Sequence, residues 1–169
     1  KDQKWTAVFI GGSDVDAGEA LLQRVSQVFF GPMKLSVMMD SNGSNTTAAA
    51  AVLAARKHLE LKGIHALVAG GTGPVGQRAA QLLARAGAHV NLASRALARA
   101  RKACEAIKAM VPEAKLTPCE IRNEVGKRIA LNKVSLIIAA GAAGVELLSQ
   151  ADLELGEGLE VAIDLNAVP

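Results

Sequence analysis

One stretch, residues 64–95, constrains the fold more than any other part of the chain. It reads IHALVAGGTGPVGQRAAQLLARAGAHVNLASR. The apolar run at 65–69 has the length of a buried strand, and the glycine-rich turn that follows carries GxGxxG at positions 71–76. A helical pattern then runs to Gly87, and residues 88–93 form a second apolar run. Strand, glycine turn, helix and strand in this order predict the first unit of a Rossmann-type dinucleotide-binding fold.

The glycine turn supplies the features that a pyrophosphate requires. Gly71 permits the tight turn, Gly73 lets the backbone approach the phosphates, and Gly76 lets the helix pack closely on the strand. Free N–H groups and the positive end of the helix dipole favour an anion at this point, and a proline is well tolerated at the first helical position. The alternative is a turn that only packs a strand–helix–strand unit. We predict pyrophosphate contacts from Gly71, Thr72, Gly73, Pro74 and Val75.

The end of the second strand indicates which dinucleotide is bound. An NAD site has Asp or Glu there, to hold the ribose 2′-hydroxyl, whereas this chain has Ser94 and Arg95. Between Leu61 and Cys104 there are seven basic residues and no acidic one, although the net charge of the whole chain is only +3. A guanidinium matches the geometry of a phosphate. The pattern predicts NADP, with the 2′-phosphate held by Ser94, Arg95 and Arg99; Arg101 and Lys102 are interpreted as a solvated helix face.

The rest of the chain predicts an α/β fold with a parallel sheet covered by helices on both faces. Half of the residues are hydrophobic but only 2% are aromatic, so Ala, Val, Leu and Ile fill the core, as is typical of such sheets. We expect further strands at 115–119, 134–139 and 159–165, with helices at 97–110 and 123–131. Earlier strands at 5–10 and 35–39 flank a helix at 15–29, which Ser13 is expected to cap, and form part of a smaller α/β lobe. The expected organisation is a substrate lobe at 1–44, a connecting helix at 45–62 and an NADP-binding domain at 63–169.

A row of polar and glycine residues, DSNGSNTT at 40–47, follows the second of the early strands and precedes an alanine-rich helix that runs to about residue 59. Open α/β sheets bind ligands beyond the carboxyl ends of their strands. Helix capping and an Asn-Gly turn are the alternative, but capping is expected to explain only one or two of these residues. The candidates for substrate contact, expected to face the cleft between the lobes, are Asp40, Asn42, Asn45 and Thr46.

Small residues after the strand at 134–139 predict the nicotinamide end of the cofactor site. Ala140, Gly141 and Ala142 leave room for a ribose and a nicotinamide ring, although close packing alone is an alternative for any single glycine. Asn166 follows the last strand and is expected to point into the same cleft, while Asp164 is expected to be structural.

Composition excludes several classes of protein. The pI is near 9.0, but the basic residues cluster on the nucleotide unit without interleaved aromatics, so we expect no nucleic-acid binding. Two cysteines without a CxxC motif predict free thiols and a cytoplasmic protein. No apolar run approaches the length of a membrane span, and three scattered histidines predict no metal site. The chain begins without Met and stops directly after a strand, so we expect a piece of a longer protein.

Several segments together resemble a known family. They are residues 10–14, 29–32, 40–47, 69–76, 140–142 and 164–169, and they are similar to the NADP-dependent methylene-tetrahydromethanopterin dehydrogenases of methylotrophic bacteria. The glycine fingerprint alone is generic, whereas the loop at 40–47 joined to it at this spacing is specific. The plan is also similar to that of the methylene-tetrahydrofolate dehydrogenases, with Leu61, Lys62 and Gly63 at the turn into the dinucleotide domain.

The resemblance implies an oxidoreductase of one-carbon metabolism. It implies hydride transfer from the methylene bridge of methylene-tetrahydromethanopterin to NADP, giving the methenyl form, and some members also accept methylene-tetrahydrofolate. The partner is then a reduced pterin carrier, and we expect a homo-oligomer. Members of the family are longer than this chain, so no catalytic residue is assigned. The alternatives are another two-lobe NADP dehydrogenase of the shikimate type, or an NADP-sensing domain without enzymatic activity.

Overall fold

Residues 48–169 form one unit, built on a five-stranded sheet in which every neighbouring pair of strands is parallel. The computed structural model describes residues 6–168, so Trp5, expected to begin the first strand, lies outside the described residues. The strand order is β5-β4-β3-β6-β7. The strands are β3 (His65–Ala69), β4 (His89–Ser94), β5 (Lys115–Glu120), β6 (Leu136–Ala139) and β7 (Val161–Asp164).

The order of these strands contains the switch that locates ligand sites in open α/β sheets. The chain proceeds outward from β3 through β4 to β5, then crosses back to β6 on the other side of β3. Ligands bind beyond the carboxyl ends of the strands at such a point. The predicted α/β class with a parallel sheet is confirmed, and the turn at 70–76 and the segment after β6 both lie at the switch.

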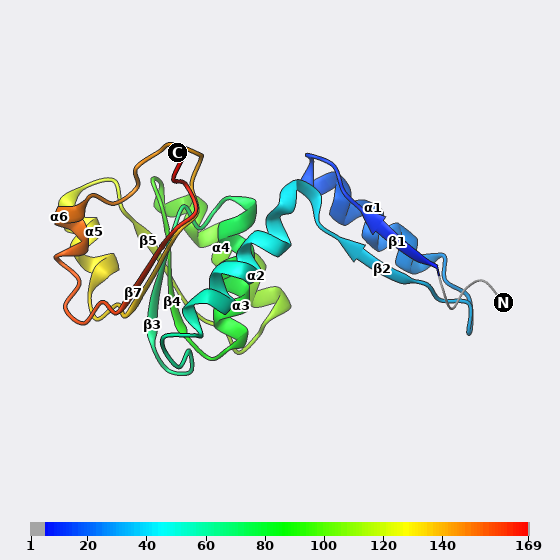
Figure 1. The fold of residues 1–169 in the computed structure, drawn as a ribbon, viewed down its shortest axis with the longest axis horizontal. Helices are drawn as coiled ribbons and strands as arrows, with labels where there is room; N and C mark the ends of the chain where they lie inside the picture. Colours follow the sequence, from blue (N-terminus) through cyan, green and yellow to red (C-terminus); the bar gives the residue numbers. More distant parts are fainter. Residues whose placement is uncertain (1–5, 169) are drawn as a thin grey trace. The chain divides into compact units, whose positions relative to one another are not determined.

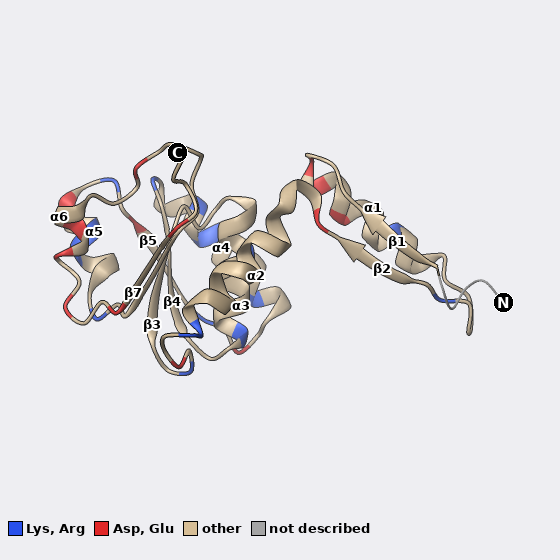
Figure 2. Cartoon of the chain, viewed as in Figure 1, with Lys and Arg blue, Asp and Glu red and all other residues tan. Residues whose placement is uncertain are grey.

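Helices cover both faces of this sheet (Figure 1). Because successive side chains of a strand point to opposite faces, Ala66 and Val68 lie in one core cluster and Leu67 and Ala69 in the other. Burial on both faces explains why the strand reads as a continuous apolar run. Figure 2 shows that the strands carry few charged residues. The helices are α3 (Pro74–Arg85), α4 (Leu97–Met110), α5 (Glu124–Leu131) and the short α6 (Gln150–Leu153), which the sequence did not predict.

The other unit, residues 1–47, contains two parallel strands and one helix among its described residues. The strands are β1 (Ala7–Ile10) and β2 (Ser36–Met39), and α1 (Val15–Gln27) connects them. The prediction that Ser13 caps α1 is wrong: the cap is Asp14, whose Oδ1 accepts a hydrogen bond of 2.9 Å from the N–H of Ala17. A carboxylate at this position reaches the third helical residue, which satisfies one of the free donors of the first turn.

Helix α2 (Ser44–Ala55) begins earlier and ends earlier than the sequence predicted. A short 3-10 turn, η2 (Ser41–Gly43), precedes it, so the polar residues from Ser44 onward are the first turn of the helix and not a loop. The later residues Ala48, Ala51, Val52 and Ala55 are buried in the first core cluster of the larger unit. None of the helices found between residues 6 and 168 is both long enough and apolar enough to cross a membrane.

Candidate functional site

The glycine loop between β3 and α3 is held by hydrogen bonds to its own backbone and to β4. The N–H of Gly71 donates to the carbonyl of Ala93 (2.9 Å), and the N–H of Gly73 donates to that of Gly70 (3.1 Å). The side-chain amide of Gln77 donates to the carbonyl of Thr72 (3.0 Å). The role of Gln77 was not predicted from the sequence, because a single Gln in the first turn of a helix belongs to no recognisable motif.

The three glycines of the fingerprint differ in what surrounds them. A Cβ atom at Gly76 would lie 2.5 Å from the backbone oxygen of Gly70, and one at Gly71 would lie 2.7 Å from Cγ of Leu92. Both positions therefore require glycine for the packing of the protein itself. At Gly73 the nearest atom to such a Cβ is 3.6 Å away, and φ is an ordinary −79°. The packing and the backbone conformation of the protein therefore do not require glycine at position 73, whereas the close approach of another molecule to the backbone would.

The start of α3 offers hydrogen-bond donors to an anion beside Gly73. Within residues 6–168, the structure records no acceptor for the backbone N–H groups of Thr72, Val75 and Gly76, and Pro74 has no N–H. The helix is 12 residues long, so its dipole adds a positive field at the same end. Free N–H groups and a positive field at a helix N-terminus constitute a phosphate-binding arrangement.

The end of β4 presents two guanidinium groups to solvent. Arg95 and Arg99 are exposed and have no ion pair or hydrogen-bond partner recorded for their side chains in the described part of the chain. Arg95 precedes α4, and Arg99 lies in its first turn. Ser94 is only 7% exposed, and its Oγ accepts a long hydrogen bond (3.5 Å) from the N–H of Ala96. Ser94 thus stabilises the turn that carries Arg95.

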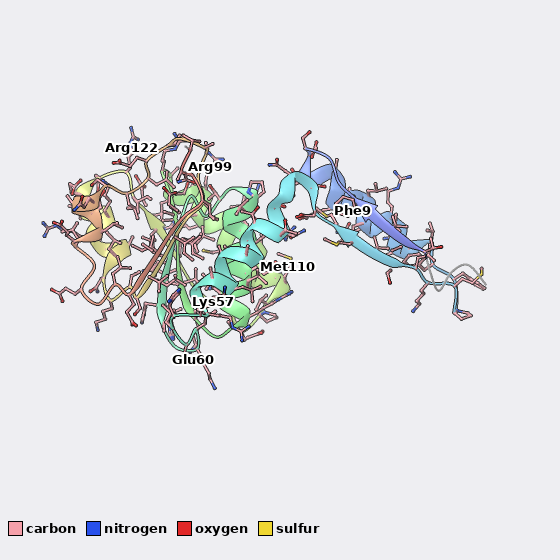
Figure 3. The ribbon with its side chains drawn as sticks, viewed as in Figure 1. Phe9, Lys57, Glu60, Arg99, Met110 and Arg122 are labelled. Atoms are coloured by element: carbon pink, nitrogen blue, oxygen red, sulfur yellow. The ribbon has the colours of Figure 1, made fainter. Side chains whose placement is uncertain are left out.

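Strand β5 and the residues after it bring two further charged side chains close to the end of β4. Neither was predicted from the sequence. Glu120 is the register partner of Ser94, and one of its carboxylate oxygens accepts a hydrogen bond of 3.4 Å from the N–H of Leu97. Arg122 follows β5 and is exposed, and Figure 3 shows it at the same end of this unit as Arg99. The charge count that indicated NADP ended at Cys104, so only the pairing of β5 with β4 reveals these groups.

The loop after β6 lies against the glycine loop. A Cβ at Gly70 would lie 2.7 Å from the backbone oxygen of Ala140, and φ of Gly70 is +73°, which favours glycine. Ala140 is buried, whereas Gly141 and Ala142 are exposed. The loops that follow the carboxyl ends of β3 and β6 therefore lie side by side, and both consist of small residues.

The side chain of Asn166 stabilises the loop after β6, because it forms hydrogen bonds with the backbone of that loop. It is 3% exposed, accepts a hydrogen bond from the N–H of Gly141 and donates one of 3.3 Å to the carbonyl of Val145. Its own N–H donates to the carboxylate of Asp164 (2.8 Å). The structure therefore shows Asn166 as a residue that positions the loop.

Asp40 caps helix α2. Its carboxylate accepts hydrogen bonds from the N–H of Asn45 (2.9 Å), the N–H of Thr46 (3.1 Å) and the hydroxyl of Thr46 (2.6 Å). The Thr46 hydroxyl and then its N–H lower the pKa of Asp40, because they stabilise the charged carboxylate. The side-chain amide of Asn45 donates to the carbonyl of Met39 (2.8 Å). The buried Ser41 and Ser44 also form hydrogen bonds inside this unit, to the carbonyls of Gly11 and Ser41.

Asn42 differs from the other three substrate candidates. Its side chain is exposed and has no partner recorded among residues 6–168, whereas its backbone N–H donates to the carbonyl of Gly12. Its φ is +55°, in the left-handed region that Asn tolerates better than most residues. Capping of α2 involves Asp40 and its partner Thr46, in line with the expectation that capping explains one or two residues of the row at 40–47. Ser41, Ser44 and Asn45 instead donate to backbone carbonyls within this unit.

No group of three or more His, Cys, Asp and Glu side chains in the described chain could hold a metal ion.

One family model and two known proteins are similar to this chain. Residues 1–42 match the family model described as methylene-tetrahydromethanopterin dehydrogenase, N-terminal. The chain is 41% identical over 171 residues to the "Bifunctional protein MdtA" of Methylorubrum extorquens, an alignment that covers all of this chain and 59% of that protein. It is 32% identical over 182 residues to the "NAD(P)-dependent methylenetetrahydromethanopterin dehydrogenase" of the same organism, covering 97% of this chain and 57% of the relative.

The chain thus spans somewhat more than half the length of these relatives. The resemblance predicted from the sequence is confirmed: residues 1–42 match the N-terminal model of the methylene-tetrahydromethanopterin dehydrogenases, and the chain is similar over nearly all its length to a protein of that name.

Proposed function

We propose that the protein is an NADP-dependent methylene-tetrahydromethanopterin dehydrogenase of one-carbon metabolism. The observation that carries this proposal is the environment of Gly73, where the chain's own packing and backbone conformation do not require glycine. A glycine kept open beside free N–H groups at a helix N-terminus is what a bound pyrophosphate needs. The name of the second similar protein, an NAD(P)-dependent methylenetetrahydromethanopterin dehydrogenase that is 32% identical to this chain, supports the substrate and the cofactor.

Each end of the dinucleotide has candidate partners in the larger unit. The loop from Gly71 to Val75, with Thr72, Gly73 and Pro74, holds the pyrophosphate by its backbone. Arg95 and Arg99 hold the 2′-phosphate, and Ser94 stabilises the turn between them. Ala140, Gly141 and Ala142 line the nicotinamide end, and Asn166 positions that loop. The guanidinium groups of Arg95 and Arg99 are exposed and have no recorded partner among residues 6–168, which supports the 2′-phosphate assignment, since a phosphate accepts paired hydrogen bonds from Arg.

The pterin carrier is proposed to contact the polar residues at 40–46, where the proposed substrate lobe at 1–44 is followed in the chain by the connecting segment. Asn42 has the side chain best placed for this, because it is exposed and makes no hydrogen bond recorded between residues 6 and 168. Asp40, Asn45 and Thr46 act by stabilising the turn that presents Asn42. The proposed connecting segment, residues 45–62, contains α2 up to Ala55 and then leads into the proposed NADP-binding domain at 63–169.

The reaction removes a hydride, that is one hydrogen with both electrons of its C–H bond, from the methylene carbon of the pterin. When bound, NADP supplies the acceptor of that hydride. The product carbon is part of a cation shared by two nitrogens of the pterin, so no proton has to leave and no general base is required. The protein contributes by holding the two partners in a reactive orientation and by excluding water.

Homo-oligomerisation and a cytoplasmic location are part of the proposal. Exposed apolar side chains, including Phe9 at 65% and Phe30 at 80% exposure, support an interface of this chain; Figure 3 labels Phe9 on β1. The buried free thiols of Cys104 and Cys119 are consistent with a reducing compartment. Light scattering of the full-length protein tests the first point.

A rate measurement tests the reaction. The full-length protein with NADP is given methylene-tetrahydromethanopterin and, separately, methylene-tetrahydrofolate, and the methenyl product is recorded together with NADPH. We expect both products to appear in equal amounts with the first carrier. The ratio of the two rates gives the pterin preference. NADP binding without turnover of either carrier would contradict the proposed function.

A further inference from the structure

We propose that Glu120 determines cofactor specificity, because its carboxylate lets the site hold the unphosphorylated ribose of NAD as well as NADP. This inference rests on the proposed function, since it concerns the same dinucleotide site. It assigns a role to a residue outside the local fingerprint of β4.

The position of Glu120 is the first argument. In NAD-binding Rossmann sites, a carboxylate at the end of the second strand of the unit accepts a hydrogen bond from the ribose 2′-hydroxyl. That strand here is β4, which ends in the buried, uncharged Ser94. Glu120 ends β5 and is paired in register with Ser94, and the N–H of Ile121 donates to the carbonyl of Ser94 (3.1 Å). The neighbouring strand therefore supplies the carboxylate that β4 lacks.

The hydrogen bonding of Glu120 is the second argument. One oxygen accepts a long bond of 3.4 Å from the N–H of Leu97, at the start of α4. No other hydrogen bond or ion pair of this side chain is recorded for residues 6–168, although Arg95, Arg99 and Arg122 all lie at the same end of the sheet. A carboxylate has about four acceptor positions. Glu120 is half-buried and therefore retains capacity to accept from a ligand.

The charges of this region set the direction of the effect. Three guanidinium groups favour a 2′-phosphate, whereas the Glu120 carboxylate repels it and attracts a hydroxyl donor. The site as a whole then binds NADP more tightly than NAD, with a preference that Glu120 reduces. Neutralising Glu120 should increase that preference.

The test is Glu120→Gln in the full-length protein, with Glu113→Gln as the matched control. Gln can still accept from the N–H of Leu97, so the start of α4 is preserved. Glu113 is exposed and precedes β5, near the opposite end of that strand from Glu120, and its substitution makes the same change in net charge. Dissociation constants for NADP and NAD are measured by calorimetry, and thermal unfolding without cofactor is recorded for each variant.

We expect Glu120→Gln to increase the ratio of the NAD to the NADP dissociation constant by about tenfold, as loss of one charge-assisted hydrogen bond implies. Glu113→Gln should leave the ratio unchanged. Equal changes in both constants would mean that Glu120 only caps α4, and would overturn the inference while leaving the proposed function intact. Binding of neither dinucleotide by the unmodified protein would overturn the proposed function as well.

Discussion

Asn166 accepts a hydrogen bond from the backbone N–H of Gly141, and this bond joins the end of the chain after β7 to the loop after β6. The same side chain donates to the carbonyl of Val145, so one buried amide fixes two points of the loop. Two backbone hydrogen bonds also hold the loop, from the N–H of Gly144 to the carbonyl of Asn166 (2.7 Å) and from the N–H of Val145 to that of Ala142 (3.1 Å). A rigid loop at this edge is what a nicotinamide ring needs in order to be held in one orientation.

Asn166→Ala removes both hydrogen bonds. We expect the free energy of unfolding to fall by about 1–3 kcal/mol, because a buried amide and its partners lose their bonds, and the dissociation constant for NADP to rise. Urea unfolding and calorimetry measure the two effects. Asn132→Ala is the control, since Asn132 is exposed at the end of α5 and should change neither quantity. Unaltered stability in Asn166→Ala would contradict the structural role of this side chain.

Gly73→Ala and Gly76→Ala should separate cofactor binding from folding. At Gly76 the new methyl group would collide with the backbone oxygen of Gly70, so we expect a loss of about 1–3 kcal/mol in unfolding free energy. At Gly73 the methyl group fits the free protein, so stability should change by less than about 0.5 kcal/mol. NADP affinity should nevertheless fall about tenfold or more, because the methyl group occupies the approach of the pyrophosphate. If Gly73→Ala binds NADP normally, the phosphate is not held there.

Arg95→Ala tests the recognition of the 2′-phosphate. We expect the variant to bind NADP more weakly by about 1.5–3 kcal/mol, the range for a hydrogen bond to a charged group, with little change for NAD. Arg101→Ala is the control, because Arg101 is exposed on α4, close in the chain to Arg95, and no cofactor contact is assigned to it. Titrations with both dinucleotides give the comparison. Equal losses for NADP and NAD in Arg95→Ala would eliminate the 2′-phosphate assignment.

Asn42→Gly removes a candidate substrate contact and keeps the backbone. Glycine adopts the φ of +55° found at Asn42 without strain, so the start of α2 should remain intact. We expect KM for the pterin to rise several-fold, about the loss of one hydrogen bond, at unchanged NADP affinity and unchanged unfolding. Asn45→Ala should instead lower stability and slow turnover, because it also removes the bond to the carbonyl of Met39. Wild-type kinetics in Asn42→Gly would assign the pterin to other residues.

Asp40 should make the smaller unit sensitive to acid. The pKa of Asp40 is lowered in the folded protein, chiefly by the hydroxyl of Thr46, and its unfolded value is about 3.9. A carboxyl with a lowered pKa stabilises folding above the unfolded pKa, and this contribution is lost as the pH falls below about 4 through the folded pKa. Asp40→Asn lacks this contribution, so the difference in stability between the variant and the wild type should shrink as the pH falls below about 4. Helix content followed during urea unfolding checks this; a constant difference would contradict it.

The sequence predicted most of the larger unit because its signals are local. The strand at 65–69 is buried on both faces and therefore reads as an unbroken apolar run, and β3, β4, α4 and β5 begin and end within about a residue of their predicted limits. The limits of a helix were predicted less well where a hydrogen bond from a side chain determines where the helix begins. The carboxylate of Asp40 starts α2 at Ser44, so residues interpreted as a substrate loop became the first turn of a helix.

The sequence by itself determined the α/β class, the glycine loop and the family to which this chain is related, because these depend on residues close together in the chain. Only the tertiary structure decided that Glu120 lies beside Ser94, that Asn166 supports Gly141, and that the side chain of Asn42 is exposed without a recorded partner among residues 6–168. The physical reason is the same in each case. Strand register and hydrogen bonds between distant residues are fixed by how the elements pair, and no periodicity along the chain records that pairing.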